Sequence, residues 1–227
     1  GDEIIEIQKV NSNVSTELTF SFNIDELEDK VPVCHYLLYR SYSESIIYSL
    51  GSYESDINPS DIDLGIVICT FKRELRVLNT LERINEIISN EEYGLRNKIT
   101  VYLVDNGQSI EHSSIKYDHV KLIPNRNDGG SGGFARGMIE ARRENKTHII
   151  LMDDDVEIDP NVIYKTFNLI SILNDKHKDA FILGGMLLPE TPNIQYEAGA
   201  EYKLEFKRGK HMLDMLNTNA LLLNDKK

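Results

Sequence analysis

The sequence has few cysteines, a deficit of basic residues and no long apolar run, and each shortage excludes a class of protein. Its 227 residues include two cysteines, Cys34 and Cys69, which are too few for a disulfide framework and favour a reducing compartment. Lysine and arginine number 25 against 37 aspartates and glutamates, and the resulting charge of −12 disfavours nucleic-acid binding. No stretch approaches the roughly 20 apolar residues of a membrane-spanning helix. These shortages, with 41% hydrophobic residues, predict a soluble globular protein without a transmembrane segment.

The character of the sequence changes near residue 60, which predicts two domains. Three short strand-like runs between residues 17 and 50 are separated by polar turns and indicate antiparallel hairpins, so residues 1–60 are predicted to form a small β module. The polar stretch 52–63, which contains Pro59, is the candidate linker. Residues 61–227 are assigned to a second domain, which we expect to be incomplete at its C-terminal end.

From residue 64 onward, short apolar runs alternate with stretches of helical spacing. Strands are predicted at 64–69, 99–104, 120–123, 148–152 and 180–183, and helices at 75–88, 131–144 and 160–173. Continuous apolar runs are typical of strands covered on both faces of a parallel sheet. Cys69 lies in the first run and is interpreted as an inert core thiol. The alternation implies βαβ units, and we predict an α/β fold with a mostly parallel sheet and helices on both faces.

Polar side chains follow each of the first four strands of this domain. They occur in the segments 70–73, 105–107, 124–130 and 153–155. Ligands of open α/β sheets bind at the carboxyl ends of the strands, so we expect these four segments to meet in space and form the functional site.

Three consecutive aspartates follow the fourth strand. Alternation along a strand would direct Asp153 and Asp155 to one point while Asp154 faces elsewhere, and Mg²⁺ or Mn²⁺ binds one or two carboxylates together with phosphate oxygens. The alternative is an acidic turn before the helix whose predicted N-cap is Asp159. We favour the metal role, because like charges this close are destabilising unless a cation neutralises them.

The glycine-rich run Gly129–Gly137 admits two interpretations. Its glycines let backbone N–H groups approach a phosphate at a helix N-terminus, or they permit a tight helix–sheet contact. Arg136 in this run either binds an anion or pairs with Glu140 one turn later. Residues 130–135 also match the G-x-G-x-x-A outline of dinucleotide-binding proteins, although that fingerprint normally follows the first strand rather than the third.

The successive segments TFKR, VYLVDNG, NRNDGGSGGFARGM and LMDDDV resemble family 2 glycosyltransferases of the GT-A fold. Within that family the chain is most similar to bacterial galactofuranosyltransferases, over Leu64 to about Met215. The resemblance implies a GT-A fold for this domain and the transfer of galactofuranose, or another hexose, from a UDP-sugar to a glycan or lipid-linked glycan acceptor of the bacterial cell envelope.

The resemblance also implies site residues. Arg73 would contact the nucleotide diphosphate, and Asp105 would lie against the uridine. Asn127 would line the diphosphate-sugar pocket with the backbone at Gly129 and Gly130. Asp153 and Asp155 would hold Mn²⁺ or Mg²⁺. Thr70 and Asp154 complete the predicted substrate-binding set.

An inverting glycosyltransferase also needs a carboxylate base, which the family places well over 100 residues after the triplet. This chain has only 72 residues after Asp155, so we expect the base to lie C-terminal to Lys227 and the chain alone to be a doubtful catalyst. His211 and Asp214 are poor candidates for the histidine metal ligand and the catalytic aspartate of the family, and we interpret them as surface residues. Because the two cysteines favour a reducing compartment, we expect a cytoplasmic protein, with peripheral attachment to the inner face of the plasma membrane as an option. An NAD-dependent oxidoreductase and a non-catalytic carbohydrate-binding or assembly module stay open as alternatives.

Overall fold

The computed structural model describes residues 57–173, 186–188, 191–203 and 205–214. The chain divides into two compact units, one of which spans Ser52–Phe181 and contains the parallel sheet discussed below. The predicted N-terminal β module falls almost entirely outside the described residues, as does the strand predicted at 180–183.

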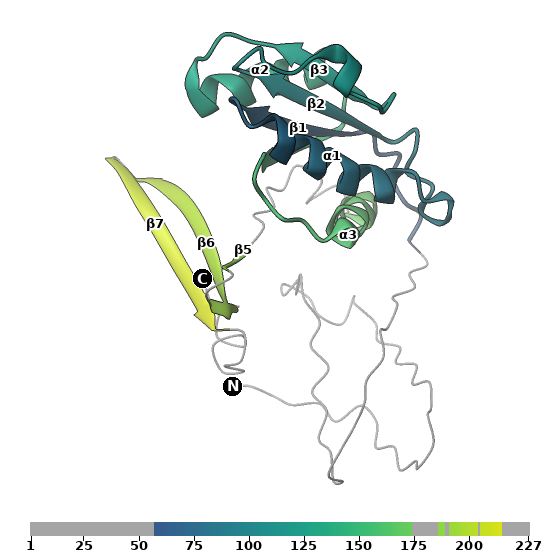
Figure 1. The fold of residues 1–227 in the computed structure, drawn as a ribbon. Coiled ribbons are helices and arrows are strands. Elements are labelled where there is room, and N and C mark those ends of the chain that lie inside the picture. Colours follow the sequence, from purple (N-terminus) through teal and green to yellow (C-terminus); the bar gives the residue numbers. More distant parts are fainter. Residues whose placement is uncertain (1–56, 174–185, 189–190, 204, 215–227) are drawn as a thin grey trace. The chain divides into compact units, whose positions relative to one another are not determined.

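The unit Ser52–Phe181 is built on a four-stranded, all-parallel sheet with the strand order β3-β2-β1-β4. Figure 1 labels the first three of these strands. The strands of this unit are β1 (Leu64–Thr70), β2 (Ile99–Asp105), β3 (Val120–Pro124) and β4 (His148–Asp153). Its helices are α1 (Glu74–Ile88), α2 (Gly129–Arg143) and α3 (Pro160–Ile172), with two short 3-10 turns at Glu91–Tyr93 and His112–Ser114. The four strands and three helices predicted within 64–173 are confirmed, with ends shifted by no more than two residues.

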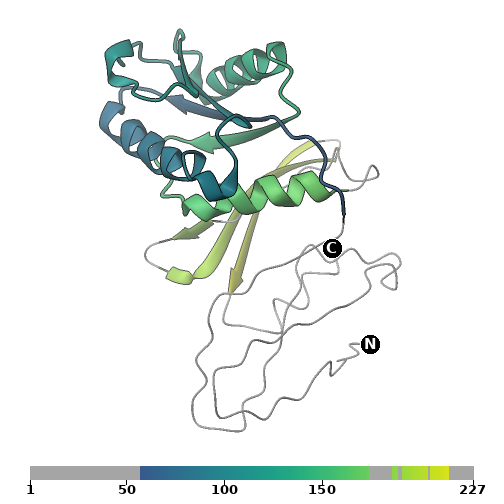
Figure 2. The same ribbon diagram turned by 90° about the vertical axis from the view of Figure 1, so that its right-hand side faces the viewer.

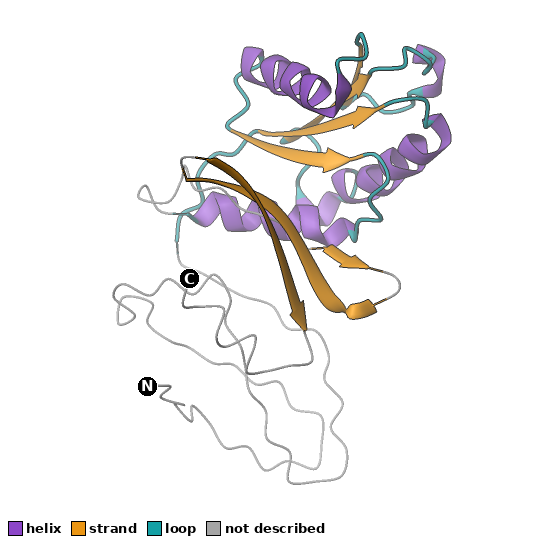
Figure 3. Cartoon of the chain, turned by 90° about the vertical axis from the view of Figure 1, so that its left-hand side faces the viewer, coloured by secondary structure: helices purple, strands orange, loops and turns teal. Residues whose placement is uncertain are grey.

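Helices cover both faces of the sheet, which explains why its central strands are continuously apolar (Figure 3). On one face, Ile66 and Ile68 of β1 belong to the core cluster that includes the apolar side of α1 and α3. On the other face, Val67 packs in a smaller cluster with Ala141 of α2. Burial of each such side chain contributes about 1.5–3 kcal/mol. Leu75 departs from the predicted helical stripe: it is 75% exposed in the first turn of α1, before the buried face begins.

Two glycines let α2 approach the sheet closely. A Cβ atom at Gly137 would lie 2.2 Å from Val67 Cγ1, and one at Gly133 would lie 2.1 Å from Cys69 Sγ. No side chain fits at such distances, so these positions require glycine. The packing interpretation of the glycine-rich run therefore holds for its second half.

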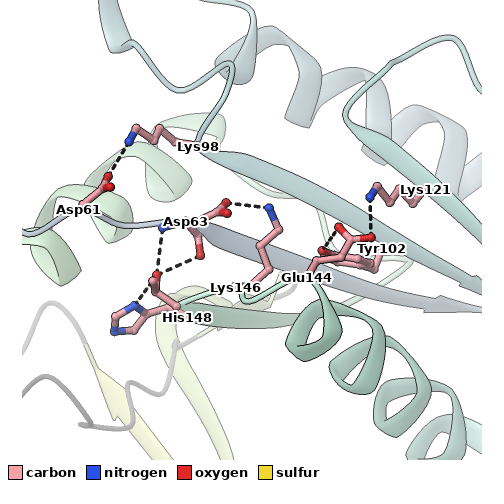
Figure 4. A network of polar contacts seen from close by, with 9 residues as sticks. Asp61, Asp63, Lys98, Tyr102, Lys121, Glu144, Lys146 and His148 are labelled. Atoms are coloured by element: carbon pink, nitrogen blue, oxygen red, sulfur yellow. Dashed lines mark hydrogen bonds and ion pairs between the residues drawn. The ribbon is translucent and has the colours of Figure 1, made fainter.

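A polar network ties the C-terminal end of α2 to the sheet (Figure 4). The Tyr102 hydroxyl donates to Glu144 Oε2 over 2.8 Å, and Lys121 Nζ donates to the other carboxylate oxygen. Lys121 lowers the pKa of Glu144, whereas burial, followed by Glu144, raises the pKa of Tyr102. Lys146 Nζ contacts Asp63 Oδ1 over 2.7 Å in the same region. These contacts fix the helix that the site below depends on.

The other described strands form a separate antiparallel sheet in the order β5-β6-β7, shown in green to yellow in Figure 2. They span Met186–Leu188, Thr191–Lys203 and Glu205–Asp214. The sequence did not predict them, because residues 191–203 contain no apolar run and only scattered large apolar residues. His211 and Asp214 both lie on β7.

The helices of the described residues contain at most 15 residues. None of them is long and apolar enough to cross a membrane.

Candidate functional site

The strand order places the candidate site at the carboxyl ends of β1 and β4. The chain runs outward from β1 to β3 and then returns to add β4 on the other side of β1. Ligands of open α/β sheets bind at such a reversal. A pocket of about 280 Å³ lies there, and its lining comes from the ends of three strands and the start of α2. The lining residues are Cys69, Thr70, Phe71, Arg73, Asn106, Asn127, Gly129, Gly130 and Asp154.

The pocket brings together most of the substrate-binding residues predicted from the sequence. Six of the seven line it, namely Thr70, Arg73, Asn127, Gly129, Gly130 and Asp154. They come from segments up to 84 residues apart in the chain. The expectation that these strand ends meet in space is therefore confirmed by the geometry, while the role of each residue stays a prediction.

Asp154 is the buried acid of the pocket. It is 6% exposed, accepts a 2.6 Å hydrogen bond from the Thr70 hydroxyl, and contacts Arg73 Nη1 over 3.2 Å. The Thr80 hydroxyl of α1 donates to its backbone oxygen over 3.3 Å. Asp154 thus holds two other lining residues, Thr70 and Arg73, in place.

Arg73 joins two of the three consecutive aspartates. Its Nη1 atom lies 2.7 Å from Asp155 Oδ2 as well as 3.2 Å from Asp154 Oδ1. Both carboxylates raise the pKa of Arg73, Asp154 most of all. The strand-like alternation expected for the triplet does not continue past Asp153, because β4 ends there and the next two residues form a turn. Asp154 and Asp155 therefore both reach Arg73, while the metal role of Asp153 and Asp155 stays a prediction.

The chemistry of the triplet fits a divalent cation with few protein ligands. Asp153 is exposed, and its carboxylate makes no hydrogen bond to any described residue; Asp155 is bound to Arg73 at one oxygen. No group of three His, Cys, Asp or Glu side chains in the described ranges could hold a metal ion. Mg²⁺ completes its coordination with waters and substrate phosphates, so one or two carboxylates are sufficient.

Asp105 does not line the pocket. Its carboxylate is 1% exposed and accepts from the backbone N–H groups of Gly107, Ser109 and Ile110 over 2.7–2.9 Å. These bonds close the loop after β2. The predicted contact with uridine would therefore involve a carboxylate whose oxygens already bind this loop.

Asn106 lines the pocket and was missed from the sequence. Its amide nitrogen donates to the Gly129 carbonyl over 3.1 Å, and its amide oxygen accepts from Asn125 over 2.8 Å. The bond to Gly129 joins the end of β2 to the start of α2. The signal in the sequence that could have identified Asn106 is its position directly after the strand β2.

The N-terminus of α2 opens onto the pocket. Gly129 has a φ of 74°, and a Cβ at Gly130 would have no atom within 4 Å, so the backbone here faces open space. Asp128, the N-cap residue, makes no side-chain capping bond to the helix. The Gly129 N–H donates to the Asn127 side-chain oxygen over 3.2 Å, so the following N–H groups of the first turn and the positive end of the helix dipole are what the helix offers to an anion. Arg136 points elsewhere and pairs with Glu140 over 2.9 Å.

Cys69 lies at the pocket wall, which corrects its assignment as a core thiol. It is partly exposed, and the Asn106 amide approaches its sulfur at 3.3 Å. Burial, followed by Asp154, Asp153 and Asp105, raises the pKa of Cys69. The raised pKa disfavours the thiolate form, and that Cys69 is not a nucleophile stays a prediction.

The family model described as glycosyl transferase family 2 matches residues 65–220 of the sequence. The chain belongs to this family. Galactofuranosyltransferase GlfT2 of Mycolicibacterium smegmatis (strain ATCC 700084 / mc(2)155) is 26% identical over 157 residues, which are 63% of this chain and 22% of the relative. The chain thus spans about a fifth of the length of the curated relative it matches. The resemblance inferred from the four segments is confirmed, together with the α/β fold with an all-parallel sheet, and the dinucleotide-binding interpretation loses its support.

Proposed function

We propose that the pocket binds the nucleotide sugar of a metal-dependent, inverting glycosyltransferase. The donor would be UDP-galactofuranose or another UDP-hexose, and the acceptor a glycan or lipid-linked glycan of the bacterial cell envelope. One observation carries the proposal: Arg73, the N-terminus of α2 and Asp154 line one pocket where the strand order reverses, and Arg73 also pairs with Asp155. A basic group, free N–H groups and carboxylates are the set that a diphosphate and a cation together require.

The diphosphate would be bound by this chain's cationic and backbone groups. Arg73 is half-exposed and offers guanidinium N–H groups beyond the one that contacts Asp155. The N–H groups of the first turn beyond Gly129, beginning with Gly130, would donate to phosphate oxygens, as helix N-termini do in other anion sites. Asn127 holds the start of the helix, because its side-chain oxygen accepts from Gly129 N over 3.2 Å.

Asp153 and Asp155, which flank the lining residue Asp154 in the chain but do not line the pocket themselves, would hold Mn²⁺ or Mg²⁺. The bound cation would neutralise the negative charge that develops on the departing UDP. Asp155 would have to share its carboxylate between Arg73 and the cation, whereas Asp153 is free of such contacts among the described residues. Thr70 and Asp154 would position Arg73 from beneath.

The galactofuranose assignment rests on the name of the bacterial relative and on the segments quoted above. The base that takes the acceptor's proton is unassigned. Asp154 is the only carboxylate among the lining residues, and its oxygens are already bound by Thr70 and Arg73.

Calorimetric titration of UDP, with and without Mn²⁺, tests the donor and metal assignments. We expect Mn²⁺ to tighten UDP binding by about tenfold or more, and Asp153→Asn to abolish that gain by removing a charged ligand. Asp61→Asn is the matched control, because Asp61 is an exposed aspartate that pairs with Lys98. Equal UDP affinity in both titrations of the wild-type protein would exclude the metal role, and absence of UDP binding would exclude the donor assignment.

Competition between UDP-galactofuranose and UDP-galactopyranose tests the sugar. We expect the furanose form to displace a bound UDP probe at a lower concentration. The opposite order would remove galactofuranose while leaving a UDP-hexose donor in place.

A further inference from the structure

Two asparagines that follow neighbouring strands bond to each other at the loop that leads into α2. Asn106 follows β2, and Asn125 follows β3. The Asn125 side-chain nitrogen donates to Asn106 Oδ1 over 2.8 Å. Asn106 is 5% exposed, and Asn125 is half-buried. A buried amide needs partners for both its oxygen and its nitrogen, so the remaining contacts of the pair show what it holds.

The two ends of the pair bond to backbone carbonyls of that loop. Asn125 Nδ2 also donates to the Arg126 carbonyl over 3.0 Å, and Asn106 Nδ2 donates to the Gly129 carbonyl over 3.1 Å. A carbonyl only accepts, so the group at each end must be an N–H. With Asn106 Nδ2 at Gly129, its Oδ1 atom is left to face Asn125, and the orientation of both amides is fixed. The pair thus joins the two ends of the segment 126–129.

The backbone of the pair is anchored to the parallel sheet. Asn106 N donates to the carbonyl of Thr70, the last residue of β1, over 2.9 Å. Asn125 N donates to the carbonyl of Asp105, the last residue of β2, over 2.9 Å. The ends of these strands therefore determine where the two amides lie, and the amides in turn hold the loop.

Gly129 is the residue on which this arrangement acts. Its φ of 74° lies in the left-handed region, and a glycine can leave that conformation easily because it has no side chain. Its N–H donates to the Asn127 side-chain oxygen over 3.2 Å, and its carbonyl accepts from Asn106. The peptide groups on both sides of its Cα atom are therefore held. Loss of the Asn106 amide would release the peptide between Gly129 and Gly130 from this bond.

That peptide also carries an N–H group that is free to meet a ligand. The Gly129 carbonyl and the Gly130 N–H belong to one planar, trans peptide, so they point in opposite directions. The bond from Asn106 to the carbonyl therefore sets the direction of the Gly130 N–H. No described residue accepts a hydrogen bond from Gly130 N. Gly130 lines the pocket, and a glycine can do so only with backbone atoms.

We propose that Asn106 and Asn125 are positioning residues for phosphate binding: their paired amides hold the Gly129–Gly130 peptide in the orientation that receives the diphosphate of the nucleotide sugar. The inference rests on the function proposed above. A peptide that is held before the ligand arrives loses less conformational entropy on binding, and the affinity is higher. Asn125 does not line the pocket, so its effect reaches the ligand through Asn106 and the loop.

Calorimetric titration of UDP in the presence of Mn²⁺ tests the proposal on three single variants. We expect Asn106→Ala to raise the dissociation constant about fivefold, the size of one hydrogen bond, and Asn125→Ala to raise it by a similar factor from outside the pocket. Asn85→Ala is the matched control, because Asn85 is also half-buried and bonds through its side chain to Ser89 at the end of α1, away from the pocket. Equal UDP affinities of the Asn125 and Asn85 variants would contradict the proposal.

The double variant distinguishes one shared path from two independent effects. If the amides act as a pair, Asn106→Ala combined with Asn125→Ala should bind UDP only slightly more weakly than Asn106→Ala alone. Independent effects would multiply, and a loss of about 25-fold would therefore overturn the pairing. Melting temperatures verify that each variant is folded in the assay. Should Asn106→Ala not fold, Asn125→Ala still decides the proposal, because it leaves every lining residue in place.

The amide signal of Gly130 in the nuclear magnetic resonance spectrum tests the positioning without a ligand. We expect Asn125→Ala to shift this signal in the free protein, and Asn85→Ala to leave it unchanged. An unmoved Gly130 signal in the Asn125 variant would overturn the proposal. Failure of the two proposals is distinguishable: if the wild-type protein binds UDP and the asparagine variants bind it equally well, the positioning role alone fails. If the wild-type protein binds no UDP, the proposed function fails.

Discussion

The Thr70 hydroxyl donates a 2.6 Å hydrogen bond to Asp154 Oδ2, and this buried contact joins the end of β1 to the turn after β4. The two residues are 84 positions apart in the chain. The bond fixes the carboxylate that also contacts Arg73, so the shape of the pocket at these strand ends depends on the alignment of two adjacent strands.

Removal of this hydroxyl should destabilise the domain. Thr70→Val keeps the shape of the side chain but leaves a buried carboxylate oxygen without its donor, and we expect a loss of about 1–3 kcal/mol in the free energy of unfolding. Thermal unfolding measures it. Thr100→Val on β2 is the control, because the Thr100 hydroxyl makes no hydrogen bond in the described ranges. Equal melting temperatures for both variants would show that the bond contributes little.

Substitution of Arg73 should weaken UDP binding. A hydrogen bond to a charged group contributes about 1.5–3 kcal/mol, so Arg73→Ala should raise the dissociation constant roughly tenfold or more. Arg73→Lys should lie between, because lysine keeps the charge but not the planar fork. Arg83→Ala is the control, since Arg83 pairs with exposed Glu157 over 2.9 Å. Calorimetry that finds Arg73→Ala and Arg83→Ala alike would remove Arg73 from the site.

A methyl group on the sheet-facing side of α2 should be poorly tolerated. Gly137→Ala would place a Cβ 2.2 Å from Val67 Cγ1, and such overpacking costs about 1–3 kcal/mol. Gly130→Ala adds the same methyl group where no atom lies within 4 Å, and the helix should gain or keep its stability. Chemical denaturation of the two variants gives the comparison. The reverse order would show that α2 is not packed as described.

The Glu144 carboxylate should make stability depend on acid pH. Lys121 lowers its pKa in the folded protein, so the unfolded chain binds the proton more readily. The stabilising effect is complete above the ordinary value of 4.5 and is lost as the pH falls through that value toward the folded pKa. Glu144→Gln should therefore lose most stability near pH 7 and approach the wild-type protein near pH 3. Urea unfolding at several pH values measures the difference, and parallel curves would refute the assignment.

The sheet was predictable because its strands are buried on both faces and need no alternation to be recognised. Residues 64–69 and 99–104 show this clearly. The hairpin of β6 and β7 was not predictable from the sequence. Its two long strands pair with each other, and neither is marked by an apolar run. At the site, topology alone was enough to predict that the strand ends meet. The directions of individual side chains were not predictable, because a turn begins after Asp153 and because Asp105 closes a loop that the spacing of residues could not reveal.

Gly133 has a consequence for the ligand rather than for the helix alone. Because Gly133 has no side chain, α2 packs directly against the sulfur of Cys69, and this close packing determines where the pocket-lining residues Gly129 and Gly130 lie. A larger residue at position 133 would push α2 away from Cys69 and displace Gly129 and Gly130, which line the pocket, although residue 133 is not itself among the lining residues. Substitutions that change which ligand the pocket accepts should therefore be sought under the helix as well as along the pocket wall.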